Sequence, residues 1–307
     1  MRHHPLPISI AVFSIAACVA AVWAGLAGVE VVHNNHGRLP PTAAKPVAEG
    51  VAPEPMIGVA GQSAAVWNKT VGVRASLSVS YVSMAKPPRK FIRWAELKAD
   101  GARPVVEILP RGHSLQSIAA GNDDGWLCAL KSGINEPIAV AFAPEANGEW
   151  YTWGQQPKLF RQAWRHVWSV LGTHNITWLW QMSSRRAVRA YWPGGRYVKW
   201  AGLDGYFSTR GSNFRTVFGS TIHAVQSFAH VPLLLSETAV GPFTGHVPAD
   251  IRQLFAGARR DHIIGVIWFN RAQSGSTNHQ DWRLRTPDVL DAFRKAAATY
   301  QGGAGAP

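Results

Sequence analysis

Residues 138–154 read IAVAFAPEANGEWYTWG, and the pattern within them organises the rest of the chain. The run IAVAF is apolar throughout, and Pro144 and Glu145 follow almost immediately. A short apolar run that ends at a turn residue is typical of a strand buried on both faces of a parallel sheet. A carboxylate directly after such a strand indicates a site at the carboxyl end of the sheet.

Further segments of the same character flank this one, with helical segments between them. The strands predicted in this way are Met56–Ala60, Leu77–Val82, Pro104–Leu109, Ile138–Phe142, Ile176–Gln181, Leu203–Phe207, Leu233–Ser236 and Ile263–Phe269. The helices predicted are Pro157–Leu171, Asn213–Ala229, Pro248–Arg260 and Pro287–Tyr300. This alternation over about 250 residues predicts an α/β fold of the (β/α)8 TIM barrel type, spanning residues 56–307. Segment 58–83 has little helical character. A doubly wound open sheet is the alternative, although residues 58–61 lack its phosphate-binding glycine loop.

Composition places the chain among globular proteins and narrows its partners. Of the 307 residues, 47% are hydrophobic and 16% charged, which excludes an intrinsically disordered chain. The 14 tryptophans suit either a large core or a sugar-binding cleft, where an indole face covers a pyranose ring. The net charge of +13 favours an anionic surface or polymer. The chain shows no nucleic-acid-binding motif, so we expect no nucleic-acid partner.

The N-terminus predicts export. Residues 8–29 carry no charged side chain and are long enough to cross a bilayer. We therefore predict a signal anchor over residues 1–32, with a cleaved signal peptide as one alternative and lipid attachment at Cys18 as another. Residues 33–55 are rich in proline and alanine and are expected to form a linker. Each alternative leaves the catalytic domain outside the cytoplasm, either membrane-anchored or secreted.

Two glutamates follow predicted strands on opposite sides of the barrel. Glu145 follows the fourth strand, and Glu237 follows the seventh, after residues LLLS at 233–236. They are three βα units of about 31 residues apart, which places them across the barrel mouth from each other. Glycoside hydrolysis needs such a pair: one carboxyl donates a proton to the leaving oxygen, and the other either attacks the anomeric carbon or activates water.

The sequence around Glu145 resembles glycoside hydrolase family 26, best known for β-mannanases. The family's acid/base motif is matched by the residues Glu145, Asn147, Gly148, Trp150, Tyr151, Trp153 and Gly154. Further stretches that resemble the family, in the same order, are residues 160–181, 191–207, 234–238, 267–270 and 281–283. The resemblance covers roughly residues 56–297 and implies a retaining enzyme on a (β/α)8 barrel.

The resemblance implies a role for each site residue. Glu145 is the expected acid/base, and Glu237 is the expected nucleophile. Substrate-binding positions are expected at Asn147, Trp150, Trp153, Tyr206 and Trp268. Within this set Tyr206 is expected to hydrogen-bond Glu237, and Trp268 to form the floor beneath the reacting sugar. Two further acids are not expected to react. Asp204 is expected to hydrogen-bond the neighbouring backbone, and Glu107 to form either an ion pair in the core or a ligand contact.

The chain also departs from the family pattern. Pro144 stands where the family has a histidine that helps to shape the subsite of the reacting sugar, and Leu109 stands where the family often has glutamate. The expected function is endo-hydrolysis of an extracellular or cell-envelope β-glycan whose identity stays open. An inactive barrel that binds glycan is the alternative. We expect a monomer without a cofactor, and the scattered histidines show no metal-ligand spacing.

Overall fold

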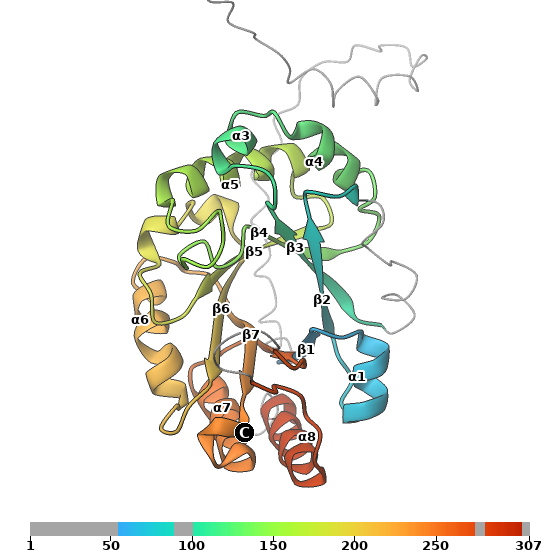
Figure 1. The fold of residues 1–307 in the computed structure, drawn as a ribbon, viewed down its shortest axis with the longest axis vertical. Coiled ribbons are helices and arrows are strands. Elements are labelled where there is room, and N and C mark those ends of the chain that lie inside the picture. The colour runs from blue at the N-terminus through green and yellow to red at the C-terminus, as the bar shows by residue number, and fades with distance from the viewer. Residues whose placement is uncertain (1–54, 89–100, 274–279, 303–307) are drawn as a thin grey trace, which may run out of the picture. The chain divides into compact units, whose positions relative to one another are not determined.

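The computed structural model describes residues 55–88, 101–273 and 280–302. Eight parallel strands form a closed barrel in chain order (Figure 1). They are β1 (Met56–Ala60), β2 (Leu77–Ser83), β3 (Arg103–Leu109), β4 (Ile138–Phe142), β5 (Ile176–Ser183), β6 (Trp200–Phe207), β7 (Leu233–Val240) and β8 (Gly265–Phe269). The barrel closes because β1 pairs with both β2 and β8. The TIM barrel expected from the sequence is confirmed, and the open sheet is excluded.

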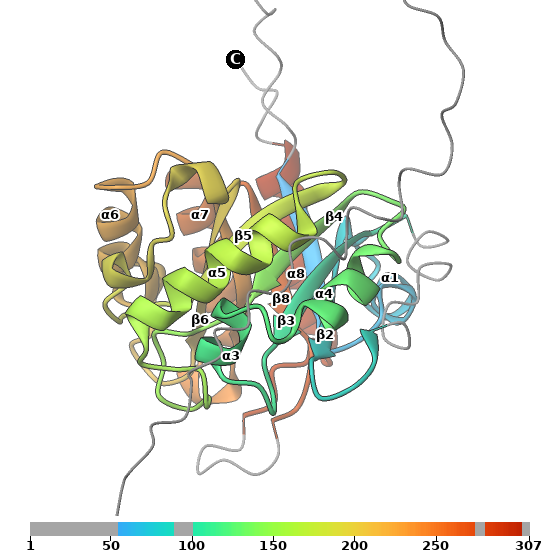
Figure 2. The ribbon, with the colours of Figure 1, turned by 90° about the horizontal axis from the view of Figure 1, so that it is seen from above.

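Helices surround the strands, and their buried faces explain where they form. They are α1 (Ala64–Val71), α3 (Leu115–Ala119), α4 (Asp124–Lys131), α5 (Pro157–Leu171), α6 (Ser220–Gln226), α7 (Val247–Arg260) and α8 (Pro287–Gly302). In Figure 2, α6 and α7 lie on one side and α1 on the other, with strands between them. In α5 a proline opens the first turn, and Phe160, Trp164, Val167 and Leu171 repeat at helical spacing on the buried face.

The helix expectations need two corrections. The segment predicted as one helix over Asn213–Ala229 begins with a π-helical turn at Arg215–Gly219 and becomes α-helical only in α6. The expectation of little helix in segment 58–83 was wrong, because α1 forms there. Ser63 caps its start by accepting a hydrogen bond from the amide of Val66, and Gly72 ends it with a φ of 74°.

Side chains alternate between the inside of the barrel and the layer beneath the helices. The inside is filled by small and branched apolar side chains, including Val79, Val105, Ala141, Leu179 and Ile267. Polar residues continue the same inward positions toward the carboxyl ends of the strands, where the chain places Tyr81, Glu107 and Gln181. The barrel core is therefore apolar below and polar at the mouth.

The segments predicted as anchor and linker lie, apart from Pro55, outside the described residues. Among the helices that the structure describes, none is both long enough and apolar enough to cross a membrane.

Candidate active site

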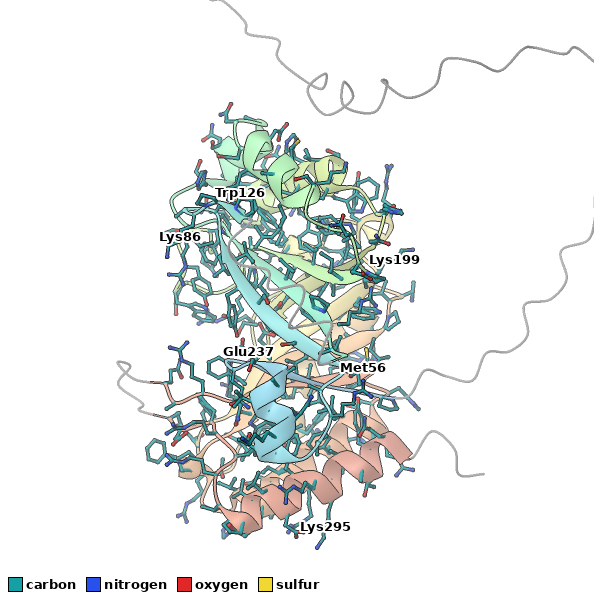
Figure 3. The ribbon with its side chains drawn as sticks, turned by 90° about the vertical axis from the view of Figure 1, so that its right-hand side faces the viewer. Met56, Lys86, Trp126, Lys199, Glu237 and Lys295 are labelled. Atoms are coloured by element: carbon teal, nitrogen blue, oxygen red, sulfur yellow. The ribbon has the colours of Figure 1, made fainter. Side chains whose placement is uncertain are left out.

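A cavity of about 710 Å³ opens at the carboxyl ends of the strands. Figure 3 shows Glu237, within β7, and Lys86, just after β2, toward one side of the barrel. Met56, which begins β1, and Lys199, which precedes β6, lie toward the other side. Four carboxyl groups line the cavity, from β3, the loop after β4, β6 and β7: Glu107, Glu145, Asp204 and Glu237. The structure thus brings the two predicted catalytic glutamates into one cleft.

Glu237 lies in β7, where the strand departs from regular pairing. Asp204 of β6 is opposite Glu237, whereas the preceding Leu203 is opposite Leu235, so Ser236 is an extra residue in the register. Such a bulge re-aims the side chain beside it, and bulges are common next to active sites. The pairing irregularity therefore accounts for how a residue within a strand presents its carboxylate to the cavity.

Two tyrosine hydroxyls hold the carboxylate of Glu237. Tyr81 donates to Oε2 at 2.6 Å, and Tyr206 donates to Oε1. Burial raises the pKa of Glu237 above its ordinary value, while both tyrosine hydrogen bonds act to lower it. These donors favour the charged carboxylate, which is the form that a nucleophile requires. The expected contact between Tyr206 and Glu237 is confirmed.

Glu145 occupies a strained turn directly after β4. Its φ is 52°, in the left-handed region that residues other than glycine seldom adopt. The indole Nε1 of Trp150 donates to its Oε2 at 2.8 Å. Burial, followed by the negative charge of Glu237, raises the pKa of Glu145 to about 7. A carboxyl group that keeps its proton up to neutral pH is suited to act as a general acid.

The loop that carries Glu145 is fixed by its own side chains. Asn147 accepts a hydrogen bond from the amide of Ser183 at 2.9 Å and donates to the carbonyl of Ser183 at 2.8 Å. The indole of Trp153 donates to the carbonyl of Pro144 at 2.9 Å. A Cβ on Gly148 would lie 2.4 Å from the ring of Trp150, so only glycine lets this ring reach Glu145.

The other two acids form the floor of the cleft. Gln181 donates through Nε2 to Glu107 at 3.1 Å and to Asp204 at 2.8 Å, and Ser236 donates to Asp204 at 2.6 Å. Burial, and then the charges of neighbouring carboxylates, raise the pKa of both acids well above their ordinary values. Among the described residues, the Asp204 carboxyl thus bonds side chains, which corrects the expected backbone contact. Glu107 pairs with no cation of the described residues, so the ion-pair alternative is not supported, whereas its place in the cleft is compatible with the ligand alternative.

Three of the predicted substrate-binding residues do not line the cavity. Trp268 is fully buried, donates to the carbonyl of Trp282 and packs against Phe293 of α8 at 5.2 Å between ring centroids. Strand parity explains the error, because Ile267 faces the barrel interior and the next residue must face the helices. Trp153 and Asn147 are also buried, and they support the Glu145 loop.

The cleft also contains aromatic residues that were not predicted from the sequence as substrate-binding positions. Tyr81, Tyr151, Phe269 and Trp282 line it together with the predicted Trp150 and Tyr206. The ring of Trp282 lies 4.7 Å from that of Tyr206, between centroids. Phe269 ends β8 and Tyr81 lies near the end of β2, and both continue the inward-facing alternation of their strands. The sequence alone does not show which residues of these apolar strands face inward.

Within the described parts of the chain, no three or more His, Cys, Asp or Glu side chains are arranged to hold a metal ion. Two histidines instead pair with aspartates: His113 with Asp123 and His166 with Asp124, each at 2.6 Å.

Comparison with known proteins shows similarity to one family of glycoside hydrolases. Residues 123–251 match the sequence profile of Glycosyl hydrolase family 26. A mannan endo-1,4-β-mannosidase of Bacillus subtilis (strain 168) is 24% identical over 181 residues, which are 50% of this chain and 47% of the relative. A second Bacillus subtilis mannan endo-1,4-β-mannosidase is 29% identical over 113 residues, 32% of this chain and 30% of the relative. The chain thus spans less than half the length of each of these relatives.

Solved structures share the barrel at lower sequence identity. A family 26 β-mannanase from Bacteroides ovatus has a TM-score of 0.58 at 13% identity and covers 81% of this chain and 89% of its own. A Bacillus subtilis mannanase has a TM-score of 0.54 at 16% identity, covering 78% and 84% of the two chains. From the profile match at residues 123–251 and this shared architecture, we conclude that the chain has a barrel fold similar to that of the glycoside hydrolase family 26 β-mannanases.

Proposed function

We propose that the chain is a retaining, endo-acting β-glycan hydrolase. The observation that carries the proposal is the contrast between two carboxyl groups in one cleft. Glu145 keeps its proton to about pH 7, whereas Glu237 accepts hydrogen bonds from two phenols that favour its charged form. Pairs of acids whose environments differ in this way divide the roles of proton donor and nucleophile.

The proposed reaction has two displacements. Glu237 attacks the anomeric carbon while Glu145 protonates the departing glycosidic oxygen, which yields a glycosyl ester on Glu237 and a shortened glycan. Glu145, now ionised, then takes a proton from water as the water oxygen attacks the same carbon. The ester bond breaks, the sugar leaves with its original configuration, and both carboxyl groups return to their starting states. Retention is implied by the resemblance to family 26.

Substitution of each glutamate tests the assignment on an activated aryl β-glycoside. Glu237→Ala abolishes turnover, because no other group forms the glycosyl ester. Glu145→Ala spares the first step, since a good leaving group needs little protonation. Azide then rescues Glu145→Ala with a product of retained configuration and Glu237→Ala with an inverted one.

The stereochemistry of the two rescued products decides between the assignments. Opposite outcomes would exchange the roles of the two glutamates, and near-normal activity in both single variants would exclude hydrolysis by this pair. The alternative of an inactive glycan-binding barrel requires that the intact chain binds β-glycans but releases no product, as read by mass spectrometry.

We further propose a β-glycan related to mannan, the polymer in the names of the two curated relatives, and not plain mannan itself. Pro144 is expected to weaken recognition of the axial 2-hydroxyl of mannose, because it stands where family 26 has histidine and offers no hydrogen-bond donor. Turnover of plain mannan should therefore be low compared with other β-glycans. Turnover of plain mannan that equals the best of the panel contradicts this part of the proposal.

Membrane anchoring and an extracytoplasmic catalytic domain remain proposals that rest on the apolar run at residues 8–29. Protease added to intact cells, followed by added detergent as a control, tests them. Digestion in intact cells supports export. Digestion seen only after the membrane is permeabilised counts against it.

A further inference from the structure

Three arginines line the same cleft as the four carboxyl groups. They are Arg111, Arg185 and Arg271, and each has an exposed side chain. They follow β3, β5 and β8, so they come from three separate loops of the barrel mouth. The cleft therefore has an acidic floor and a basic rim, and the rim charge is distributed around the opening.

The three guanidinium groups have no partner among the described residues of the protein. No hydrogen bond or ion pair in the described chain involves the side chain of Arg111, Arg185 or Arg271. The four carboxyl groups of the cleft are hydrogen-bonded by tyrosine, tryptophan, glutamine and serine side chains. The rim arginines are therefore not needed to hold the catalytic groups.

Nearby surface acids also have other partners. Glu149, in the loop after β4, pairs with Arg186 at 3.1 Å, and Asp281 pairs with Arg283 and Arg285 at 2.8 and 3.1 Å. The rim arginines thus face the cleft without a competing anion from these residues.

The backbone at each rim arginine is fixed. The amide of Arg111 donates to the carbonyl of Leu109 at 2.7 Å, and the carbonyl of Arg271 accepts from the amide of Trp282 at 3.1 Å. The amide of Arg185 donates to the hydroxyl of Thr221 at 2.8 Å, and Arg185 has a φ of 60°. A non-glycine residue held in the left-handed region beside a cleft is typical of functional sites.

We propose that the cleft selects an acidic β-glycan, whose carboxylate or sulfate substituents bind Arg111, Arg185 and Arg271. The planar guanidinium group offers paired donors that match the two oxygens of such an anion. The floor accommodates the uncharged reacting sugar, while charged substituents on neighbouring sugars meet the rim. This inference rests on the proposed hydrolase function and specifies its substrate class.

Binding to matched polymers tests the inference. The full-length protein carrying Glu237→Gln, which removes the nucleophile, is titrated with three polymers made from one batch of mannan: unmodified, carboxymethylated and sulfated. Affinity electrophoresis reports retardation by each. Tighter binding of at least one acidic polymer than of unmodified mannan is expected. Comparison of the carboxymethylated polymer with the sulfated polymer identifies which anion the cleft binds. Equal retardation by all three overturns the inference.

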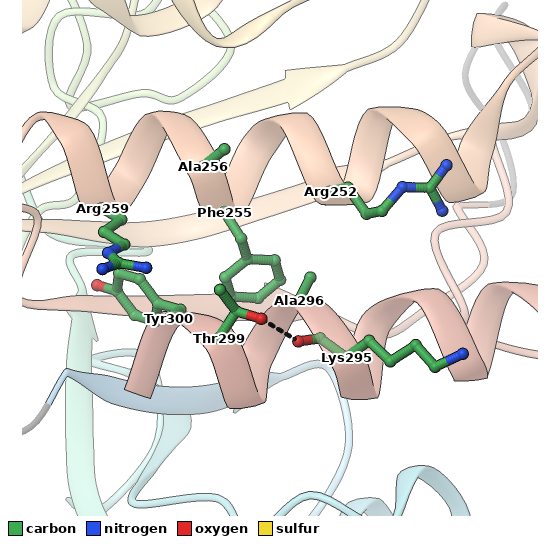
Figure 4. A pocket seen from close by; sticks show the side chains of 8 residues that line it. All are labelled: Arg252, Phe255, Ala256, Arg259, Lys295, Ala296, Thr299 and Tyr300. Carbon is green, nitrogen blue, oxygen red and sulfur yellow. Dashed lines mark hydrogen bonds between the residues drawn. The ribbon is translucent and has the colours of Figure 1, made fainter. Parts of the chain in front are cut away.

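A charge-matched control distinguishes binding by the three rim arginines from non-specific binding by the basic surface of the whole protein. The triple variant Arg111→Gln, Arg185→Gln and Arg271→Gln is expected to bind the preferred acidic polymer about tenfold more weakly, as for three exposed ion pairs. The control carries Gln at Arg215, Arg252 and Arg259, so it loses the same charge. Arg252 and Arg259 line a separate groove beside α7 and α8 (Figure 4), and Arg215 lines another cavity.

The control variant should retain the binding of the parent protein, and equal losses in the two triple variants overturn the inference. The preference for acidic polymer should also disappear near 0.5 M salt, where the Debye length is about 4 Å. Failure here is distinct from failure of the hydrolase proposal. A protein that cleaves neutral mannan and shows the predicted azide stereochemistry, yet ignores polymer charge, loses only its acidic selectivity.

Discussion

At the scale of single residues, two phenols control the charge of Glu237. Replacing Tyr81 or Tyr206 by phenylalanine removes a donor that favours the carboxylate, so the pKa of Glu237 should rise. Because the nucleophile must be ionised, the acidic limb of the pH profile of kcat/KM moves to higher pH, by about one unit per hydroxyl. The profile is measured on an aryl β-glycoside.

Tyr300→Phe is the control for this experiment. Its hydroxyl donates to the carbonyl of Ile263 at 2.5 Å, and it is buried in α8 outside the cleft. Its loss should lower stability without moving the acidic limb. An unmoved limb in both Tyr81→Phe and Tyr206→Phe would show that the two phenols do not tune the nucleophile.

The raised pKa of Glu145 carries a cost in stability. Its pKa is about 7 in the folded protein, against an ordinary value of about 4.3 in an unfolded chain. The folded state thus binds this proton more tightly, so stability falls as pH rises from about 4.5 through 7. Glu145→Gln preserves the shape but cannot ionise. We expect an unchanged Tm at pH 4 and a Tm several degrees higher at pH 8, by calorimetry.

Glu149→Gln, in the same loop but at a largely exposed carboxylate, is the matched control. A Tm increase for Glu145→Gln that is equal at both pH values would contradict the linkage, because it would not depend on ionisation.

At the scale of elements, the close contact between β6 and β7 sets the position of the nucleophile. A Cβ at Gly202 would lie 2.5 Å from Ser236 Oγ and 2.9 Å from Leu179 Cδ1. Gly202→Ala should therefore push β6 away from the bulge that presents Glu237, costing about 1–3 kcal/mol and most of the activity. Urea unfolding and kcat measure the two effects.

Gly195→Ala provides the comparison, because no atom lies within 4 Å of its added methyl group. It should leave stability and kcat near the parent values. If Gly202→Ala matches it in both measurements, the tight contact does not position Glu237.

The elements also show what the sequence is able to predict. Strand positions were predictable because each strand is a short apolar run between turn residues. Side-chain direction was not, because both faces of such strands are apolar, and so Trp268 was assigned to the cleft that Phe269 lines. Helix α1 was not predicted from its sequence because long-range packing stabilises it: Trp67 contacts Phe293 of α8 at 5.3 Å between ring centroids.

In the candidate site, too, some residues could be predicted from the sequence and others could not. Glu145 and Glu237 were predictable because each follows an apolar strand run within a motif typical of the family. Tyr81 was not, because its function appears only when its hydroxyl meets Glu237, which is 156 residues further along the chain.

At the scale of the whole molecule, the barrel should fold without the segment before residue 51. Residues 51–307 form one compact unit, and β1 starts at Met56. A chain that begins at Val51 should unfold cooperatively in urea and retain activity. A chain that begins at Ala75 lacks β1 and α1, and should show neither property. Cooperative unfolding of the shorter chain would show that closure by β1 is dispensable.

Pairing between the first and last strands also constrains when this protein becomes complete during synthesis. Until residues 265–269 leave the ribosome, β1 lacks its second partner, β8, and the backbone groups of β7 are unpaired on the side that faces β8. A nascent chain that stalls before this point exposes two strand edges, which attract other unpaired strands. The closed ring of backbone hydrogen bonds can therefore form only after almost the entire chain has been synthesised.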